Sequence, residues 1–221
     1  MNRTSIAQQY FILTVDQNGH MPVMRKDSCN ATLVAACIMD LLLHGSITME
    51  RKKITVIATL PDGCGHLASL YAYLAQKPRS LNKLTQDYML STSRRIKQLS
   101  ADIGKSLLPA QAVTKSTGGW FGNQTVYIPD PDCQNALAAT LRSAVMQDSG
   151  LSPSDAALLF LLHETKTLNQ YFSKQETAAW KQTWRAIKRD PQNKQLADMI
   201  HYVDDLNALM SFWVLHMTGQ S

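Results

Sequence analysis

Residues 30–57, NATLVAACIMDLLLHGSITMERKKITVI, decide the fold class of this chain. Only two positions between residues 31 and 43 are polar, so a helix here is apolar on nearly every face. Such a helix belongs in the protein interior, because a surface helix needs only an apolar stripe. It is shorter than the ~20 residues of a bilayer span. Gly45 ends it, and two β-branched segments flanking residues 50–53 predict a small β-hairpin.

The rest of the chain predicts more helices and a second hairpin. Residues 156–163 and 206–217 are almost wholly apolar, so we expect them to join residues 31–43 as three central helices. A Thr-Gly-Gly turn within residues 108–131 predicts the second hairpin. Amphipathic segments predict an outer layer at residues 66–76, 81–104, 134–147 and 175–189. The sequence therefore predicts a mainly α fold, a single-domain helical bundle over residues 1–221, with apolar central helices, an outer layer of amphipathic helices and two short β-hairpins.

Composition indicates a globular protein with a modest excess of positive charge. The chain has 221 residues, of which 45% are hydrophobic and 18% charged. Its 22 Lys and Arg against 17 Asp and Glu give a formal net charge of +5. This balance mildly favours an acidic partner, such as a nucleic acid or an anionic lipid. The N-terminal residues contain no apolar signal-peptide region and the cysteines no CxxC pair, so we expect a cytoplasmic protein with free, mostly buried thiols.

Motifs for catalysis, metal binding and cofactor binding are missing from the sequence. His163 and Glu164 begin an HExxH pattern, but position 167 is Thr where the second metal ligand would stand. Residues 61–65 lack both the Walker lysine and the GxGxxG spacing of phosphate-binding loops. We therefore expect no enzyme activity, no catalytic residues, no cofactor and no metal.

Basic residues form four small clusters along the chain. Any one of these clusters fits an ordinary solvated protein surface. Two clusters gathered on one face would instead form an anion-binding site, because guanidinium groups bind phosphate through two hydrogen bonds. The clusters are Arg25-Lys26, Arg51-Lys52-Lys53, Arg94-Arg95 with Lys97, and Lys188-Arg189.

Four segments resemble, in order, the pattern of the Golgi phosphoprotein 3 family. Residues 33–50 resemble its apolar helix ending in ELALRGRL-like residues, and residues 61–74 its GDxLLDEAL-like helix. Residues 96–108 resemble its LxxKGVL-like turn, and residues 155–172 its LLALxHASxxLxxxF-like helix. The resemblance implies a helical bundle with a protruding β-hairpin. It also implies a peripheral membrane protein that recognises phosphatidylinositol 4-phosphate and recruits glycosyltransferases.

The residues of the family's headgroup pocket have only partial counterparts in this sequence. In the family a Trp and an Arg near the apolar helix contribute to the pocket, and Arg25 and Val34 stand at these positions here. A further Arg-x-x-Arg pair falls on Ser93 and Ile96, next to two arginines. The resemblance therefore implies a looser lipid-headgroup site made of four cations, Arg25, Arg94, Arg95 and Lys97.

The second hairpin carries two neighbouring aromatic residues, Trp120 and Phe121, directly after its turn. Neighbouring residues of a strand point to opposite faces, so one ring can pack on the core while the other stays exposed. One possibility is that both rings are buried beneath the ribbon. The resemblance places the family's oligomerisation hairpin at this point, and we therefore expect a homo-oligomer with Trp120 or Phe121 at the contact.

The function predicted from the sequence is that of a non-catalytic adaptor at a membrane surface. We expect a cytoplasmic, peripherally membrane-associated protein that binds anionic phospholipid or phosphoinositide headgroups. The alternative is a cytoplasmic protein-interaction scaffold without lipid binding. A nucleic-acid module ranks third, because the net charge permits it but no recognition-helix pattern is present. The sequence lacks the basic N-terminal tail of the family, and in this respect the chain resembles a compact bacterial relative.

Overall fold

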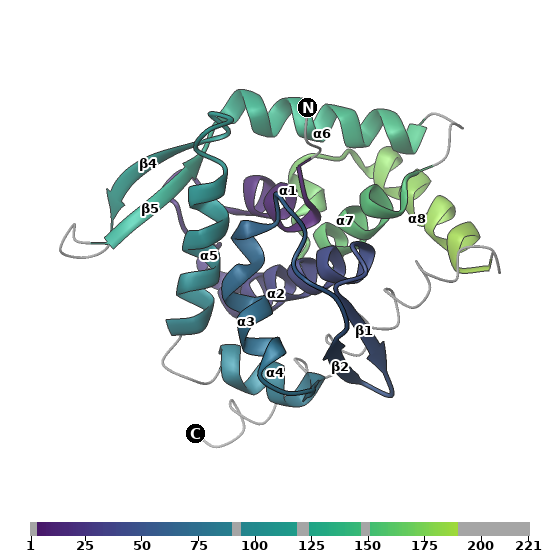
Figure 1. Ribbon diagram of the computed structural model, residues 1–221. Coiled ribbons are helices and arrows are strands. Elements are labelled where there is room, and N and C mark those ends of the chain that lie inside the picture. The colour runs from purple at the N-terminus through teal and green to yellow at the C-terminus, as the bar shows by residue number, and fades with distance from the viewer. Residues whose placement is uncertain (1–3, 90–93, 119–123, 147–150, 190–221) are drawn as a thin grey trace, which may run out of the picture.

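The computed structural model describes residues 4–89, 94–118, 124–146 and 151–189, and these form a mainly α protein with two small antiparallel sheets (Figure 1). The predicted fold class is thereby confirmed. The described helices are α1 Ile6–Thr14, α2 Lys26–Leu43, α3 Ala68–Ala75, α4 Leu81–Met89, α5 Arg94–Ser106, α6 Pro131–Met146, α7 Pro153–Glu164 and α8 Lys174–Arg189. Three short 3-10 turns, η1 Val23–Arg25, η2 Gly65–Leu67 and η3 Leu168–Gln170, connect them. The strands are β1 Ile47–Glu50, β2 Lys53–Val56, β3 Arg79–Ser80, β4 Val113–Gly118 and β5 Gln124–Pro129.

Helices α1, α2 and α7 form the centre of the protein. Every residue of α2 from 31 to 41 is buried, as is every residue of α7 from 156 to 162, which confirms both as apolar central helices. The third segment expected there, residues 206–217, lies outside the described residues. Helix α1 is an additional central helix, since all but one of its side chains are buried and it contacts both α2 and α7.

The buried carboxylate Asp40 links α2 to α1. Its two oxygens accept hydrogen bonds from the backbone N–H groups of Ile6 at 2.8 Å and Ala7 at 2.9 Å. The first amides of a helix have no partner inside the helix, so Asp40 supplies the acceptors that α1 lacks. Ser5 and Gln8 complete the cap through a reciprocal capping box. A polar residue inside an apolar helix thus has a structural role in the neighbouring helix.

The first hairpin pairs β1 with β2, and β3 adds a short third strand. Ile47 lies opposite Val56 and Glu50 lies opposite Lys53, as the hairpin prediction requires. The turn consists of Arg51 and Lys52, whose φ angles are 48° and 63°. Two-residue hairpins favour such left-handed conformations because their twist matches that of the flanking strands.

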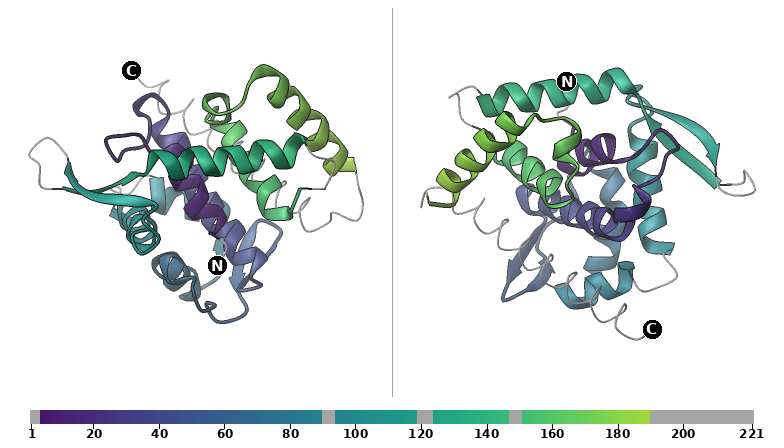
Figure 2. Two further views of the ribbon diagram at one scale, coloured as in Figure 1. Left: turned by 90° about the horizontal axis from the view of Figure 1, so that it is seen from above. Right: turned by 180° about the vertical axis from the view of Figure 1, so that it is seen from behind.

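The second hairpin, β4 with β5, projects from the helical body, as both Figure 1 and Figure 2 show. Thr117 pairs with Thr125 and Gly118 with Gln124, so the strand extends into the segment expected to form the turn. The turn prediction at residues 117–119 is to that extent wrong. Trp120 and Phe121 lie outside the described residues.

The amphipathic helices surround this centre, as expected for an outer layer. On α8 the side chain of Trp180 is fully buried, and that of Trp184 stacks on Phe160 of α7 with ring centroids 4.6 Å apart. Within the described part of the chain, no helix has both the length and the apolar character needed to cross a membrane.

Candidate functional site

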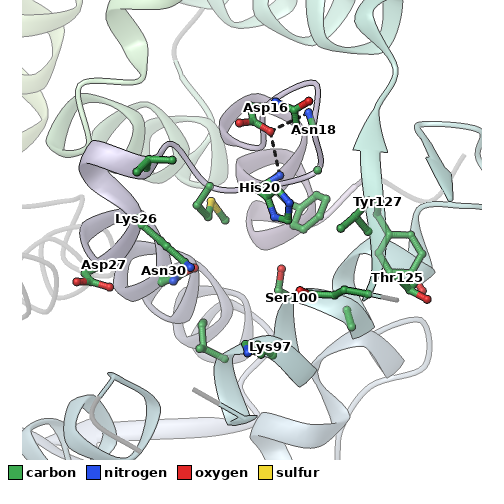
Figure 3. Close-up of a pocket in the computed structure, with 18 of the residues that line it drawn as sticks. Asp16, Asn18, His20, Lys26, Asp27, Asn30, Lys97, Ser100, Thr125 and Tyr127 are labelled. Atoms are coloured by element: carbon green, nitrogen blue, oxygen red, sulfur yellow. Dashed lines mark hydrogen bonds between the residues drawn. The ribbon is translucent and has the colours of Figure 1, made fainter. Parts of the chain in front are cut away.

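A cavity of about 640 Å³ lies between the start of α2, the middle of α5, strand β5 and the loop that joins α1 to α2 (Figure 3). The loop runs directly into α2, whereas α5 and β5 are far away in the sequence and meet these segments only through the fold. Seen from behind, the α1–α2 loop lies beside α5 and the second hairpin (Figure 2). The cavity is therefore a product of tertiary packing, and its walls are parts of the rigid framework.

The α1–α2 loop is held in one conformation by its own hydrogen bonds. The Asp16 carboxylate accepts hydrogen bonds from the backbone N–H of Asn18 at 2.9 Å and of His20 at 3.0 Å. Gly19 adopts a φ of +76°, and a Cβ atom there would lie 2.7 Å from the Cβ of Val126 on β5. The loop therefore requires a glycine at this position, both for its backbone conformation and for its close approach to β5.

Two lysines on different helices supply the positive charge of the cavity. Lys26 and Asn30 on α2 lie opposite Lys97 and Ser100 on α5, below the loop (Figure 3). Asp27 is on the wall formed by α2, but its side chain points away from the cavity in Figure 3. One oxygen of the Asp16 carboxylate, Oδ1, accepts both loop amides. An anion held between α2 and α5 would meet two ammonium groups and short polar side chains, with the Asp16 carboxylate on the loop side of the cavity.

The N-terminus of α2 adds to this positive potential. Its N-cap residue is Arg25, which makes no side-chain hydrogen bond to the first amides of the helix. The helix dipole makes the start of a helix favourable for negative charge. The eighteen residues of α2 begin at Lys26, so the dipole and the first ammonium group act at the same place.

The buried part of the cavity lining is apolar. Tyr88 and Ile96, both almost fully buried, belong to this part. Burial raises the pKa of Tyr88 above its usual range, so this side chain adds no negative charge at neutral pH.

The structure does not bring the four predicted headgroup cations together. Lys97 lines the cavity. The Arg25 guanidinium instead donates a hydrogen bond to the backbone carbonyl of Thr165, just beyond α7. The Arg95 guanidinium lies over the ring of Tyr73, 4.7 Å from its centroid, and Arg94 is exposed at the start of α5. Arg95 and Lys97 are separated by about 200° around the helix axis, so they face different neighbours.

Lys26 lines the cavity, although it is not among the four cations predicted from the sequence. The signal was present, because Lys26 belongs to the Arg25-Lys26 cluster, but only the start of α2 shows which of the two residues faces the cavity. Ile96, at a position where the family pattern has arginine, lines the cavity with an apolar side chain. Val34, at the other arginine position, is buried in the core.

A second group of polar residues lies where α1, α2 and η2 meet. The Cys64 sulfur is 3.8 Å from Nε2 of His44, and the Ser5 hydroxyl is 3.0 Å from Nε2 of His66. Burial raises the pKa of the Cys64 thiol and lowers the pKa of His66 to about 4. The Cys64 thiol is therefore neutral at pH 7, whereas a cysteine nucleophile acts as the thiolate.

Two comparisons with known proteins bear on the identity of the chain. A search among curated proteins found no match to the sequence. The family model of Golgi phosphoprotein 3 (GPP34), in contrast, matches residues 6–203, which include every described element from α1 to α8. A match over most of the chain confirms the resemblance that the sequence motifs indicated. The chain is a member of the Golgi phosphoprotein 3 family.

Proposed function

We propose that this protein is a non-catalytic adaptor that associates peripherally with membranes and binds the phosphate of an anionic phospholipid headgroup in the cavity between α2, α5 and β5. The observation that carries the proposal is the placement of Lys26 and Lys97 across one cavity at the start of α2. Membership of the Golgi phosphoprotein 3 family supports a lipid-binding role.

The geometry favours a phosphate group over a larger or uncharged ligand. Two ammonium groups from different helices can approach a phosphate from two sides. Asn30 and Ser100 offer hydrogen bonds to the remaining oxygens of a headgroup. The volume of about 640 Å³ is in the range of pockets that hold small ligands.

The same residues argue for weak selectivity among anionic lipids. An ammonium group acts as a compact point charge, whereas a guanidinium group fixes the orientation of a phosphate through paired hydrogen bonds. The positive charges in the cavity come from lysines. Positions 34 and 96, where the family pattern has arginine, carry Val and Ile in this chain. We propose that phosphatidylglycerol and phosphatidylinositol 4-phosphate bind with similar affinity at equal membrane charge.

Liposome sedimentation of a Lys26→Ala/Lys97→Ala variant tests the proposal. Each lysine contributes about 1 kcal/mol near an anionic surface, so we expect the double variant to bind phosphatidylglycerol vesicles roughly thirtyfold more weakly. Binding of the unaltered protein should also fall as salt rises from 50 to 300 mM, because the Debye length shrinks.

A Lys181→Ala/Arg185→Ala variant on the exposed face of α8 is the matched control, since it removes the same charge elsewhere. We expect this control to keep most of the binding. Equal weakening in both variants would mean that net charge alone drives the association and would contradict a headgroup site in the cavity.

A further inference from the structure

The two most exposed large hydrophobic side chains of the described chain are neighbours at the mouth of the cavity. Met24 is 95% exposed and Val23 is 85% exposed. Val23 also lines the cavity itself. Elsewhere in the described residues, only Ile57 and Met146 are comparable, at 62% and 61%. Adjacent side chains this apolar and this exposed are unusual on a protein that stays in water.

We propose that Val23 and Met24 form an apolar anchor that enters the interfacial region of an anionic bilayer when the cavity holds a lipid headgroup. The proposal rests on the function proposed above and extends it from the headgroup to the acyl chains. The turn η1, between Pro22 and Lys26, is then the part of the protein that lies deepest in the membrane.

The turn is built to present these side chains in a fixed position. The backbone N–H of Arg25 donates to the carbonyl of Pro22 at 2.9 Å, and that of Lys26 donates to the carbonyl of Val23. The Arg25 guanidinium ties the turn to the carbonyl of Thr165. Met21, just before the turn, is buried. Exposure of Val23 and Met24 is therefore imposed by the fold, and Arg25 acts as a positioning residue.

The position of the cavity explains why a bilayer would cover this turn. The phosphate of a bound phospholipid would lie between Lys26 and Lys97, at the start of α2. Its acyl chains must then leave through the cavity mouth, where Val23 is part of the rim. The neighbouring side chains would thus lie at the level of the upper acyl carbons, which is the depth at which interfacial apolar residues are buried. Lys26, directly after the turn, remains at the level of the headgroups.

The test compares Val23→Ser/Met24→Ser with Ile57→Ser/Met146→Ser, a control that removes a similar amount of exposed apolar surface at the two other sites. We expect the first variant to bind phosphatidylglycerol vesicles roughly ten- to hundredfold more weakly at 150 mM salt, because burial of such side chains is lost. The control should bind like the unaltered protein. Both variants should unfold at unchanged temperature, since the replaced side chains are exposed.

A soluble probe separates the anchor from the cavity. In NMR titrations with glycerol 3-phosphate, which has a phosphate but no acyl chain, Met24→Ser should bind like the unaltered protein, because Met24 is not part of the cavity lining. Lys26→Ala/Lys97→Ala should lose binding. A Met24→Cys variant in a Cys133→Ser background, labelled with an environment-sensitive dye, should shift to the blue on vesicles and be quenched by lipids that carry a shallow nitroxide.

Three results would overturn the anchor. Unchanged vesicle affinity of Val23→Ser/Met24→Ser, with the lysine dependence intact, would remove the anchor but keep the headgroup site. Equal losses in the Ile57→Ser/Met146→Ser control would indicate non-specific adhesion. Loss of glycerol 3-phosphate binding in Met24→Ser would assign this residue to the cavity and not to an anchor. Failure of the unaltered protein to bind either vesicles or glycerol 3-phosphate would overturn the proposed function itself.

Discussion

Asp40 and His66 are two titratable side chains buried close to the start of α1, with 2% and 5% of their surfaces exposed. Burial raises the pKa of Asp40, although the amides of Ala7 and Ile6 work in the opposite direction. Burial lowers the pKa of His66 to about 4. The two groups therefore respond to acid in opposite senses: the folded protein takes up a proton more readily at Asp40 and less readily at His66 than the unfolded chain does.

We expect His66 to make the protein less stable in mild acid. Between pH 6.5 and about 4 the unfolded chain binds a proton at this residue and the folded protein does not, so the free energy of unfolding falls as pH falls. The largest contribution is about 3 kcal/mol, and Asp40 offsets part of it. Urea unfolding across this range should show a smaller loss for His66→Gln, whose amide can still reach Ser5. Titration of the His66 ring near pH 6.5 by NMR would contradict the prediction.

At the scale of the elements, one close contact fixes the second hairpin on the helical body. Gly104 on α5 is buried, and a Cβ atom there would lie 2.4 Å from Cδ2 of Tyr127 on β5. The backbone of α5 and the tyrosine ring are in direct contact for this reason. Because β5 and α5 are both cavity walls, the same contact sets the width of the candidate site.

We therefore expect Gly104→Ala to destabilise the protein by about 1–3 kcal/mol, the usual cost of overpacking. It should also weaken glycerol 3-phosphate binding, since Tyr127 must move and it lines the cavity. Thermal unfolding and NMR titration measure the two effects. Gly65→Ala is the matched control, because nothing lies within 4 Å of a Cβ atom there. Unchanged stability of Gly104→Ala would mean that the hairpin shifts freely on α5.

The sequence predicts the central position of a helix best when the helix is apolar on all faces and not only along one stripe. Helices α2 and α7 were predictable because runs such as residues 156–162 are apolar at every position. The central place of α1 was not, because its start depends on Asp40, which is distant in sequence. The residues of the cavity are predictable only in part. Lys97 is a predicted cation that does line it. Arg25 is a predicted cation that turns to the Thr165 carbonyl instead, because of the direction of the turn before α2, which the sequence does not reveal.

At the scale of the whole molecule, the hairpin of β4 and β5 extends beyond the helical body (Figure 1). Val126 and Tyr127 pack inward, while Thr114 and Lys115 on the facing strand are exposed. A projecting ribbon with an exposed strand offers backbone groups to a second copy of the chain. The predicted contact residues, Trp120 and Phe121, lie outside the described residues, so self-association stays a prediction from the sequence and the family.

We expect the protein to form a homo-oligomer through this hairpin. Replacing residues 116–123 by a short Gly-Ser turn should remove the two aromatic residues and reduce the mass to that of a monomer. Light scattering at tens of micromolar measures the change, and thermal unfolding verifies that the helical body stays folded. A monomeric unaltered protein, or a variant of unchanged mass, would show that the hairpin is not the oligomerisation element.

The cap that Asp40 provides has a consequence for synthesis on the ribosome. Helix α1 is the first described helix to emerge, yet the carboxylate that accepts two of its amides follows only after the whole of the α1–α2 loop and most of α2. Until residue 40 has left the ribosome, α1 lacks both this cap and the helix on which it packs. The N-terminal helix therefore gains its full stability only after the second helix has emerged as well.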